Sequence, residues 1–193
     1  MPKSIAVIIT EKNEDIEVVA PIDIWRRAGI KVQTFSISES SIIQLAHGTN
    51  IIPDNNFNLE KISKFSAVYF PGGKGFENYF NFFNNSEFIS LLKNQFINND
   101  EKYILAMCAA PKFLAFSGLI NGRNYTCYPG FEVEFPETYR NENVISHENL
   151  ITAKGPGVVF EFAFKVIEEI ISKEKAEEIS SEMFFSLTND KIS

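Results

Sequence analysis

The first 37 residues alternate between the patterns of buried strands and of an amphipathic helix. Residues 5–9 form a continuous apolar run, which is typical of a strand buried on both faces. Apolar residues then recur at helical spacing from Ile16 to Ala28, and Gly29 follows where a helix C-cap is expected. The alternation over residues 30–37 predicts a second strand. Strand, helix and strand in this order predict the βαβ unit of a parallel sheet.

Further along, short apolar runs and helical patterns continue to alternate. Strands are predicted at residues 66–70, 103–107, 125–128, 144–146 and 150–153, and a small hairpin-like insertion at 38–53. Helices are predicted at residues 87–97, 109–116, 157–172 and 174–186. This alternation predicts an α/β fold, a flavodoxin-like three-layer sandwich with a mostly parallel central sheet.

Length and composition indicate one globular domain, which we place over residues 1–193. No apolar run approaches the ~20 residues of a membrane helix, and the run after the N-terminus is too short for a signal peptide. The net charge of -7 argues against a nucleic-acid partner, which would need clustered Lys and Arg. Because Cys108 and Cys127 are the only cysteines, we expect free thiols and a cytoplasmic location rather than a disulfide-stapled secreted domain.

The candidate chemistry gathers at one edge of the predicted sheet. Ligand sites of such folds lie beyond the carboxyl ends of the strands, where the loop after Ile9, the turn at residues 71–73 and Cys108 all fall. Cys108 stands between a strand and a helix, a position that exposes a side chain as in the nucleophile elbow of hydrolases. The amides of the following helix favour an anion, so we expect a lowered pKa for this thiol. The alternative is an inert core cysteine.

Glu17 is the carboxyl group placed to meet that thiol. It lies on the inward face of the first helix and can point across the strand ends to Cys108. Pro21 cannot donate a hydrogen bond to the Glu17 carbonyl, so we expect the helix to be disturbed there. A protonated carboxyl could donate to the thiolate, whereas an ionised one would repel it and raise the thiol pKa. A solvated helix carboxylate is the alternative.

Gly72 and Gly73 end a predicted strand and allow positive φ and close backbone approach. With the amide of Ala109 they could form an oxyanion hole, or they could simply make a turn. The only histidines, His47 and His147, show no spacing that suggests a metal site. We therefore expect no metal site.

Taken together, these segments resemble the ThiJ/PfpI superfamily, in the branch of the parkinsonism-associated protein deglycase. The matching stretches keep the same order and spacing over nearly the whole chain: Glu17, residues 20–23, 26–30, 68–73, 106–111, 155–157 and 160–163. The resemblance implies a flavodoxin-like sandwich that forms a homodimer. It also implies that Cys108 is an oxidisable nucleophile and that Glu17 hydrogen-bonds it.

The resemblance further implies roles for residues around the thiol. The amides of Gly73 and Ala109 would line the oxyanion site, and Pro129 would form part of the pocket wall. Arg27 and His47 would lie near the dimer side of the pocket, with His47 standing where an arginine is often found.

Two residues depart from the family pattern, and they bear on the general base and on peptidase activity. Tyr128 stands where the human-like members carry a histidine, and a tyrosine with a pKa of about 10 is a poor base at neutral pH. Ala109 follows the nucleophile where the protease branch has a histidine, so a peptidase is disfavoured.

The leading hypothesis is a cofactor-free glyoxalase or deglycase acting on methylglyoxal, glyoxal or their adducts. Cys108 would form a hemithioacetal, and Glu17 would act as general acid and base. The alternative is an oxidative-stress sensor or redox-controlled chaperone, in which Cys108 is oxidised to sulfinic acid. A third possibility is a structural domain with a buried, inert Cys108.

Overall fold

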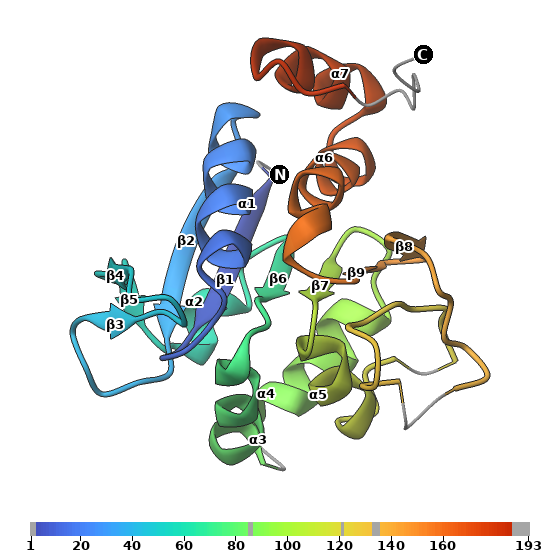
Figure 1. The fold of residues 1–193 in the computed structure, drawn as a ribbon. Coiled ribbons are helices and arrows are strands. Elements are labelled where there is room, and N and C mark those ends of the chain that lie inside the picture. Colours follow the sequence, from blue (N-terminus) through green and yellow to red (C-terminus); the bar gives the residue numbers. More distant parts are fainter. Residues whose placement is uncertain (1–2, 85–86, 121, 133–135, 187–193) are drawn as a thin grey trace.

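The computed structural model describes residues 3–84, 87–120, 122–132 and 136–186. Its main sheet contains β1 (Ser4–Ile9), β2 (Lys31–Ser36), β5 (Asn55–Asn56), β6 (Ala67–Phe70), β7 (Tyr103–Met107), β8 (Val144–His147) and β9 (Leu150–Ala153). The seven strands lie in the order β5-β2-β1-β6-β7-β9-β8 (Figure 1). Only β8 pairs antiparallel with its neighbour in this sheet, which confirms the predicted mostly parallel arrangement.

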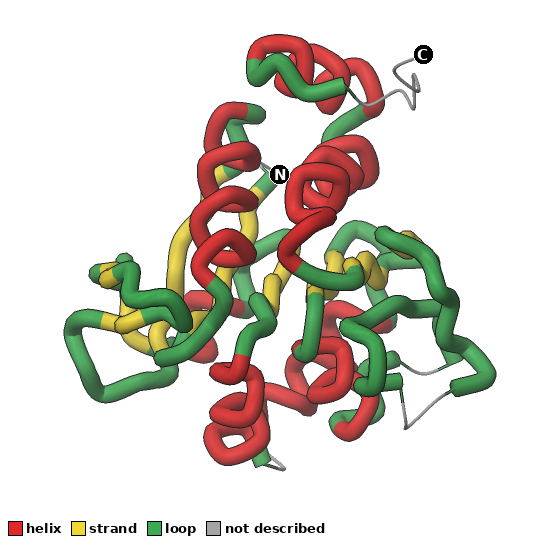
Figure 2. Tube along the Cα trace, viewed as in Figure 1, coloured by secondary structure: helices red, strands yellow, loops and turns green. Residues whose placement is uncertain are grey.

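Helices flank the strands, and a small hairpin lies to one side (Figure 2). The hairpin pairs β3 (Ile43–Gln44) with β4 (Asn50–Ile51). The α-helices are α1 (Asp15–Arg27), α2 (Leu59–Ile62), α3 (Glu77–Phe83), α4 (Glu87–Leu91), α5 (Ala110–Phe116), α6 (Val159–Ile170) and α7 (Lys173–Glu182). Short 3-10 turns are η1 (Lys74–Phe76) and η3 (Pro156–Val158), and a π-helical turn is η2 (Leu92–Ile97). Within the described ranges, we find no helix with the length and apolar character that crossing a bilayer requires.

Strand β6 shows how the two faces of the sheet are covered. Tyr69 packs against Trp25 of α1 and Phe162 of α6, whereas Phe70 contacts Phe113 of α5. Successive strand residues point to opposite faces, so α1 and α6 cover one face and α5 covers the other. Helices α3 and α4 join α5 through aromatic contacts with Phe70. The predicted three-layer sandwich is therefore confirmed.

Pro21 lies inside α1 without ending the helix. The Glu17 carbonyl, which a proline cannot serve, accepts a hydrogen bond from the Tyr69 hydroxyl at 2.8 Å. The predicted disturbance is therefore limited to one hydrogen bond: the Tyr69 hydroxyl takes the place of the missing amide donor at residue 21. This bond connects α1 to β6 next to Glu17.

Some predicted elements differ from the structure. The strand predicted at residues 125–128 is wrong: only an isolated bridge joins Tyr125 to Tyr139. The reason is that the amides of this segment bond to separate partners, Thr126 to a threonine side chain and Tyr128 to the Cys108 carbonyl, rather than to one neighbouring strand. The helix predicted at residues 87–97 passes into the π-helical turn η2.

The sequence pattern does not predict helix α3. Its aromatic residues have modest helix propensity, and they occur on more than one face, so the alternation of apolar and polar faces is not visible. Its buried Tyr79 and Phe83, four residues apart, are the face that packs inward.

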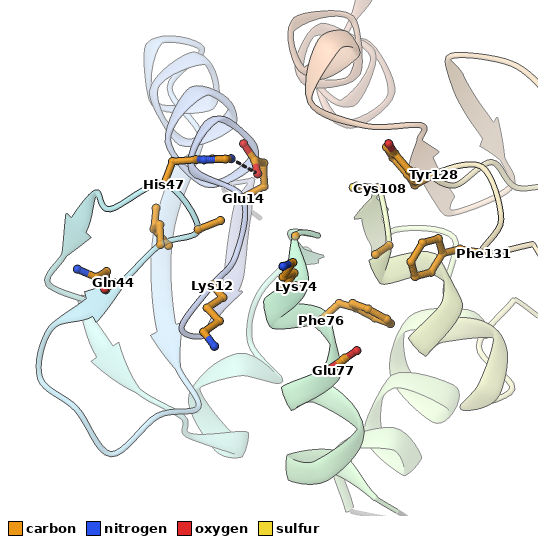
Figure 3. Close-up of a pocket in the computed structure, with 14 residues that line it drawn as sticks. Lys12, Glu14, Gln44, His47, Lys74, Phe76, Glu77, Cys108, Tyr128 and Phe131 are labelled. Carbon is orange, nitrogen blue, oxygen red and sulfur yellow. Dashed lines mark hydrogen bonds and ion pairs between the residues drawn. The ribbon is translucent and has the colours of Figure 1, made fainter.

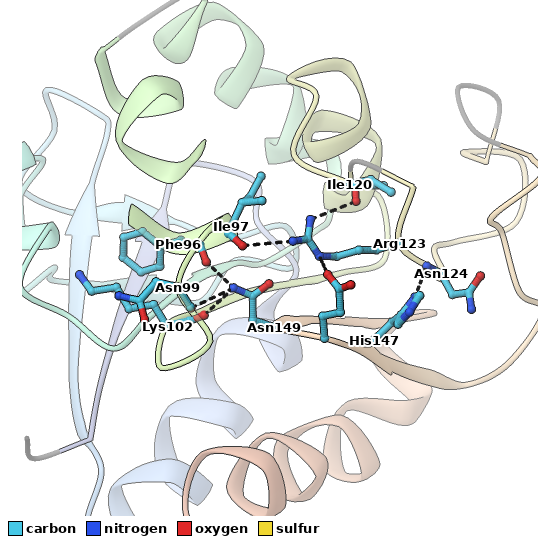
Figure 4. Close-up of polar contacts among 10 residues, drawn as sticks. Phe96, Ile97, Asn99, Lys102, Ile120, Arg123, Asn124, His147 and Asn149 are labelled. Atoms are coloured by element: carbon cyan, nitrogen blue, oxygen red, sulfur yellow. Dashed lines mark hydrogen bonds and ion pairs between the residues drawn. The ribbon is translucent and has the colours of Figure 1, made fainter. Parts of the chain in front are cut away.

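The amino end of β7 and β9 is held by a buried polar network (Figure 4). Nδ2 of Asn149 donates to the carbonyl oxygens of Phe96, Asn99 and Lys102. The buried guanidinium of Arg123 donates to the carbonyls of Ile97 and Ile120. Its Nε lies 2.7 Å from a carboxylate oxygen of Glu148. This network fixes the loops at the amino end of the sheet.

Candidate active site

Cys108 lies at the opposite, carboxyl end of the sheet, between β7 and α5. Its φ of +59° falls in the left-handed region, which non-glycine residues seldom adopt. Both of its backbone groups are held: its amide donates to the Ala153 carbonyl and its carbonyl accepts from the Tyr128 amide, each at 2.8 Å. The structure therefore has the sharp strand-to-helix turn that the sequence predicted, and such strain is often found at functional sites.

Glu17 reaches this turn from α1 and is fully buried. Its Oε2 accepts from the Gly72 amide at 2.7 Å, and the carboxyl also hydrogen-bonds the Cys108 thiol. A Cβ at Gly72 would lie 2.6 Å from the Cys108 Cβ and 2.8 Å from Oε2, so only glycine allows this approach. Gly72 thus serves as the anchor of the Glu17 carboxyl.

Burial sets the electrostatics of the pair. It raises the pKa of Glu17 to about 7, although the hydrogen bond from Gly72 opposes the shift. Burial and the neighbouring Glu17 carboxylate raise the pKa of Cys108 to about 12, against the amides of Gly73 and Ala109. The lowered thiol pKa expected from sequence is therefore wrong, because two amide donors do not outweigh burial and a carboxylate. Near neutral pH, a neutral thiol faces a carboxyl group that can accept its proton.

The thiol side of this pair opens into a cavity of about 700 Å³ (Figure 3). The side formed by the loop after β1 and by the hairpin carries Lys12, Glu14, Gln44 and His47, and the side nearer Cys108 carries Phe76, Tyr128 and Phe131. The Gly73 and Ala109 backbones also line the cavity beside the thiol. A small carbonyl compound entering it would meet the sulfur and both amides together.

The residues predicted around the site are placed unequally. Tyr128 lines the cavity and is half exposed, and His47 lines it with its ring 3.2 Å from the Glu14 carboxylate. Pro129 is exposed and is not part of the cavity wall. Arg27 lies at the far end of α1, where it pairs with Asp23, and does not line the cavity within one chain.

Asn13 and Lys12 were not selected from the sequence, although both lie in the loop that connects β1 to α1. Asn13 is fully buried and donates to the carbonyls of the turn at residues 71–72. The carboxyl-end rule pointed to this loop, but nothing in the local sequence identified which of its polar residues would turn inward.

No cluster of three or more His, Cys, Asp or Glu side chains suited to a metal ion occurs in the parts of the chain that the structure describes. Cys127 is the other thiol. It is free and fully buried, and burial raises its pKa to about 12.

The fold and site thus define an α/β sandwich with a cysteine at a strand-to-helix turn and a buried glutamate beside it. The profile of the DJ-1/PfpI family matches residues 3–169, and the chain belongs to this family.

Individual relatives cover most of the chain. Protein dj-1beta of Drosophila melanogaster is 34% identical over 183 residues, which are 93% of this chain and 96% of the relative. Its crystal structure superimposes with a TM-score of 0.84 at 33% identity, over 96% of this chain and 100% of that one. The glutathione-independent glyoxalase DJR-1.2 of Caenorhabditis elegans is 32% identical over 168 residues, 86% of this chain and 87% of the relative. Oxidized Toxoplasma gondii DJ-1 has a TM-score of 0.84 at 27% identity, over 95% and 99% of the two chains.

Proposed function

We propose that this protein is a glutathione-independent glyoxalase or deglycase that acts on methylglyoxal, glyoxal or their adducts without a cofactor. The observation that carries the proposal is the buried Glu17–Cys108 pair, which faces a cavity beside the Gly73 and Ala109 amides. The name of the Caenorhabditis elegans relative, a glutathione-independent glyoxalase, supports this substrate class.

In the first step, the Cys108 sulfur attacks the aldehyde carbon of the substrate and forms a carbon–sulfur bond. The ionised Glu17 carboxyl accepts the thiol proton as the bond forms. The thiol therefore need not ionise beforehand, which its raised pKa disfavours. Negative charge develops on the aldehyde oxygen, where the amides of Gly73 and Ala109 would stabilise it. Glu17 then passes the proton to that oxygen, which gives a hemithioacetal and leaves the Glu17 carboxyl ionised for the next step.

In the second step, a proton moves from the former aldehyde carbon to the adjacent carbonyl carbon. Glu17 would remove and return this proton, because a carboxyl with a pKa of about 7 can do both near neutral pH. The first carbon is oxidised and the second reduced, so no external oxidant is needed. The product is a thioester, and water from the open cavity hydrolyses it to lactate or glycolate and regenerates the thiol.

The second candidate is an oxidative-stress sensor or redox-controlled chaperone. Exposure of Cys108 to the cavity favours it, since peroxide could reach this thiol and would not reach the fully buried Cys127. The oxidized Toxoplasma gondii relative is compatible with this chemistry. The raised pKa of Cys108 counts against it as the main role, because peroxide reacts with the thiolate.

We also infer a homodimer formed through the outer face of α1. Val19 is 47% exposed and Ile52 is 77% exposed, and both line one groove with Ile22 and Ile51. A second copy would cover this apolar surface, which lies beside the hairpin that carries His47. Such a dimer should separate into monomers on Val19→Glu substitution, as measured by light scattering. The free cysteines are compatible with the cytoplasmic location predicted from sequence.

The test of the enzyme proposal is lactate formation from methylglyoxal without glutathione. Wild-type protein should form lactate and folded Cys108→Ser protein should not. No lactate from folded wild type would overturn the proposal, and the departure at Tyr128 would then be the first residue to examine.

A further inference from the structure

The turn that carries Gly72 and Gly73 is hydrogen-bonded to the loop between β1 and α1 and to helix α3. Gly73 has a φ of +78°, and a Cβ at this position would lie 2.4 Å from the Glu14 amide nitrogen. The Gly72 amide anchors Glu17, and the Gly73 amide faces the Cys108 sulfur. The direction of two functional amides therefore depends on what holds the carbonyls of the same turn.

Asn13 and Tyr79 supply the side-chain hydrogen bonds to those carbonyls, and the Glu14 amide adds a backbone hydrogen bond to the Gly72 carbonyl at 3.2 Å. Nδ2 of Asn13 donates to the Gly72 carbonyl at 2.8 Å and lies 3.2 Å from the Pro71 carbonyl. The Tyr79 hydroxyl lies 2.9 Å from the Pro71 carbonyl and 3.1 Å from the Ile8 carbonyl, either of which can take its proton.

The two side chains also bind each other, because Nδ2 of Asn13 donates to the Tyr79 hydroxyl at 3.0 Å. Oδ1 of Asn13 accepts from the Thr10 amide at 2.7 Å, so the amide oxygen and nitrogen both have partners. Asn13 and Tyr79 are fully buried, and the hydrogen bonds form within the protein interior.

Asn13 also connects the turn to the far side of the cavity. Its carbonyl accepts from the Ala46 amide at 2.9 Å, one residue before His47. The side chain of Asn13 thus holds the turn next to the thiol, and the backbone carbonyl of Asn13 holds the hairpin on the opposite side of the cavity.

We propose that Asn13 and Tyr79 form a positioning pair, which aims the Gly73 amide at the reacting sulfur and oxygen and the Gly72 amide at Glu17. Neither residue touches the thiol, so they act through the turn. The effect on turnover rests on the proposed glyoxalase function, whereas the effect on thiol reactivity does not.

The test compares Asn13→Ala, Tyr79→Phe and Asn149→Ala. Asn149 is the matched control, a buried asparagine whose Nδ2 also donates to backbone carbonyls but at the other end of the sheet. All three variants are first compared by urea unfolding. The reaction rate of Cys108 with iodoacetamide is then measured from pH 7 to pH 10 by peptide mass spectrometry, with Cys127 as an internal reporter of unfolding.

Without the hydrogen bonds of the positioning pair, the turn should hold the Gly73 amide less well, and the thiolate should be less stabilised. We expect the alkylation rate of Cys108 at pH 8 to fall about tenfold in Asn13→Ala and several-fold in Tyr79→Phe, with Asn149→Ala like wild type. Lactate turnover should fall about tenfold to a hundredfold in kcat with little change in KM. The Asn13→Ala/Tyr79→Phe double variant should lose less than the product of the single effects, since both act on one turn.

The proposal is overturned if Asn13→Ala and Tyr79→Phe lose stability as Asn149→Ala does but keep the wild-type alkylation profile. Faster labelling of Cys127 together with Cys108 would also overturn it, because the residues would then only hold the fold. If wild-type protein makes no lactate, the alkylation profile still decides the positioning role, and the two failures stay distinct.

Discussion

Arg123 at the amino end of the sheet and Glu17 at its carboxyl end are both charged residues placed in the interior. Arg123 meets the carboxylate of Glu148 at 2.7 Å and bonds two carbonyls besides (Figure 4). Glu17 has no ion-pair partner in the described part of the chain, and its carboxyl is hydrogen-bonded there to the Gly72 amide and the Cys108 thiol, neither of which carries a positive charge. The charge of Arg123 is compensated by a carboxylate, whereas that of Glu17 is not, so protonation of Glu17 is favoured.

The difference teaches how a structural network and a reactive one can be told apart. Backbone strain does not separate them, since Glu148 has a φ of +55° and Cys108 one of +59°. The distinguishing features are the missing counter-charge and the cavity beside Cys108. An uncompensated carboxyl in the interior has a raised pKa, which costs stability and prepares it for proton transfer.

The largest expected effect separates the two cysteines. Cys108→Ser should lower lactate turnover by roughly a thousandfold or more, because the serine hydroxyl is a far weaker nucleophile in this setting. Cys127→Ala should keep turnover within about threefold and cost about 1 kcal/mol of unfolding free energy for the buried sulfur. Turnover assays and urea unfolding check both; equal losses of activity in the two variants would remove the distinction.

Glu17→Gln should lower kcat/KM by about a hundredfold to ten-thousandfold, the usual range for a lost general acid–base group. Glu14→Gln is the matched control in the same cavity, since this carboxylate contacts His47 and not the thiol. The control should stay within about fivefold of wild type. Similar losses in both variants would point to the charge of the cavity rather than to Glu17.

The same substitution should raise stability at alkaline pH. The pKa of Glu17 is about 7 in the folded chain against an ordinary value of 4.5, so the folded state holds this proton more tightly. The resulting stability is fully present below pH 4.5 and is lost as the pH rises to about 7. Glu17→Gln should therefore match wild type near pH 4.5 and exceed it by up to roughly 3 kcal/mol at pH 8. Urea unfolding at both pH values measures this difference, and a less stable variant at pH 8 would contradict the assignment.

At the amino end the sign should be reversed. Glu148→Gln leaves the buried Arg123 without its counter-charge, and we expect a loss of about 1 kcal/mol with no change in turnover. Urea unfolding at pH 7, with the lactate assay as the second readout, checks this smallest effect. A stabilised Glu148→Gln variant would show that the two ends do not differ as described.

The fold could be predicted from sequence because its central strands are apolar throughout and its long helices have clear periodicity. Strand β7 and helix α6 are examples that lie where the pattern placed them. The sequence does not predict helix α3, because its many aromatic residues give no clear helical periodicity. The strand predicted at residues 125–128 is wrong, because hydrogen bonds to distant residues decide the backbone conformation of this segment.

The site could be predicted in part. The positions of Cys108 and the turn at residues 71–73 follow from strand ends, and that of Glu17 follows from the inward face of the first helix. The direction of the thiol pKa could not be derived, since it depends on how deeply Glu17 and Cys108 are buried together. Asn13 was missed because its partners, Pro71, Gly72 and Tyr79, lie far along the chain.

The measurement that tests the Glu17–Cys108 pair most directly is the pH dependence of kcat/KM for lactate formation, in wild type and in Glu17→Gln. If ionised Glu17 accepts the thiol proton, the wild-type value rises through a pKa of about 7 and levels above it, and Glu17→Gln lacks this rise. A wild-type rate that falls as the pH rises through 7, or a rise that persists unchanged in Glu17→Gln, would contradict the account.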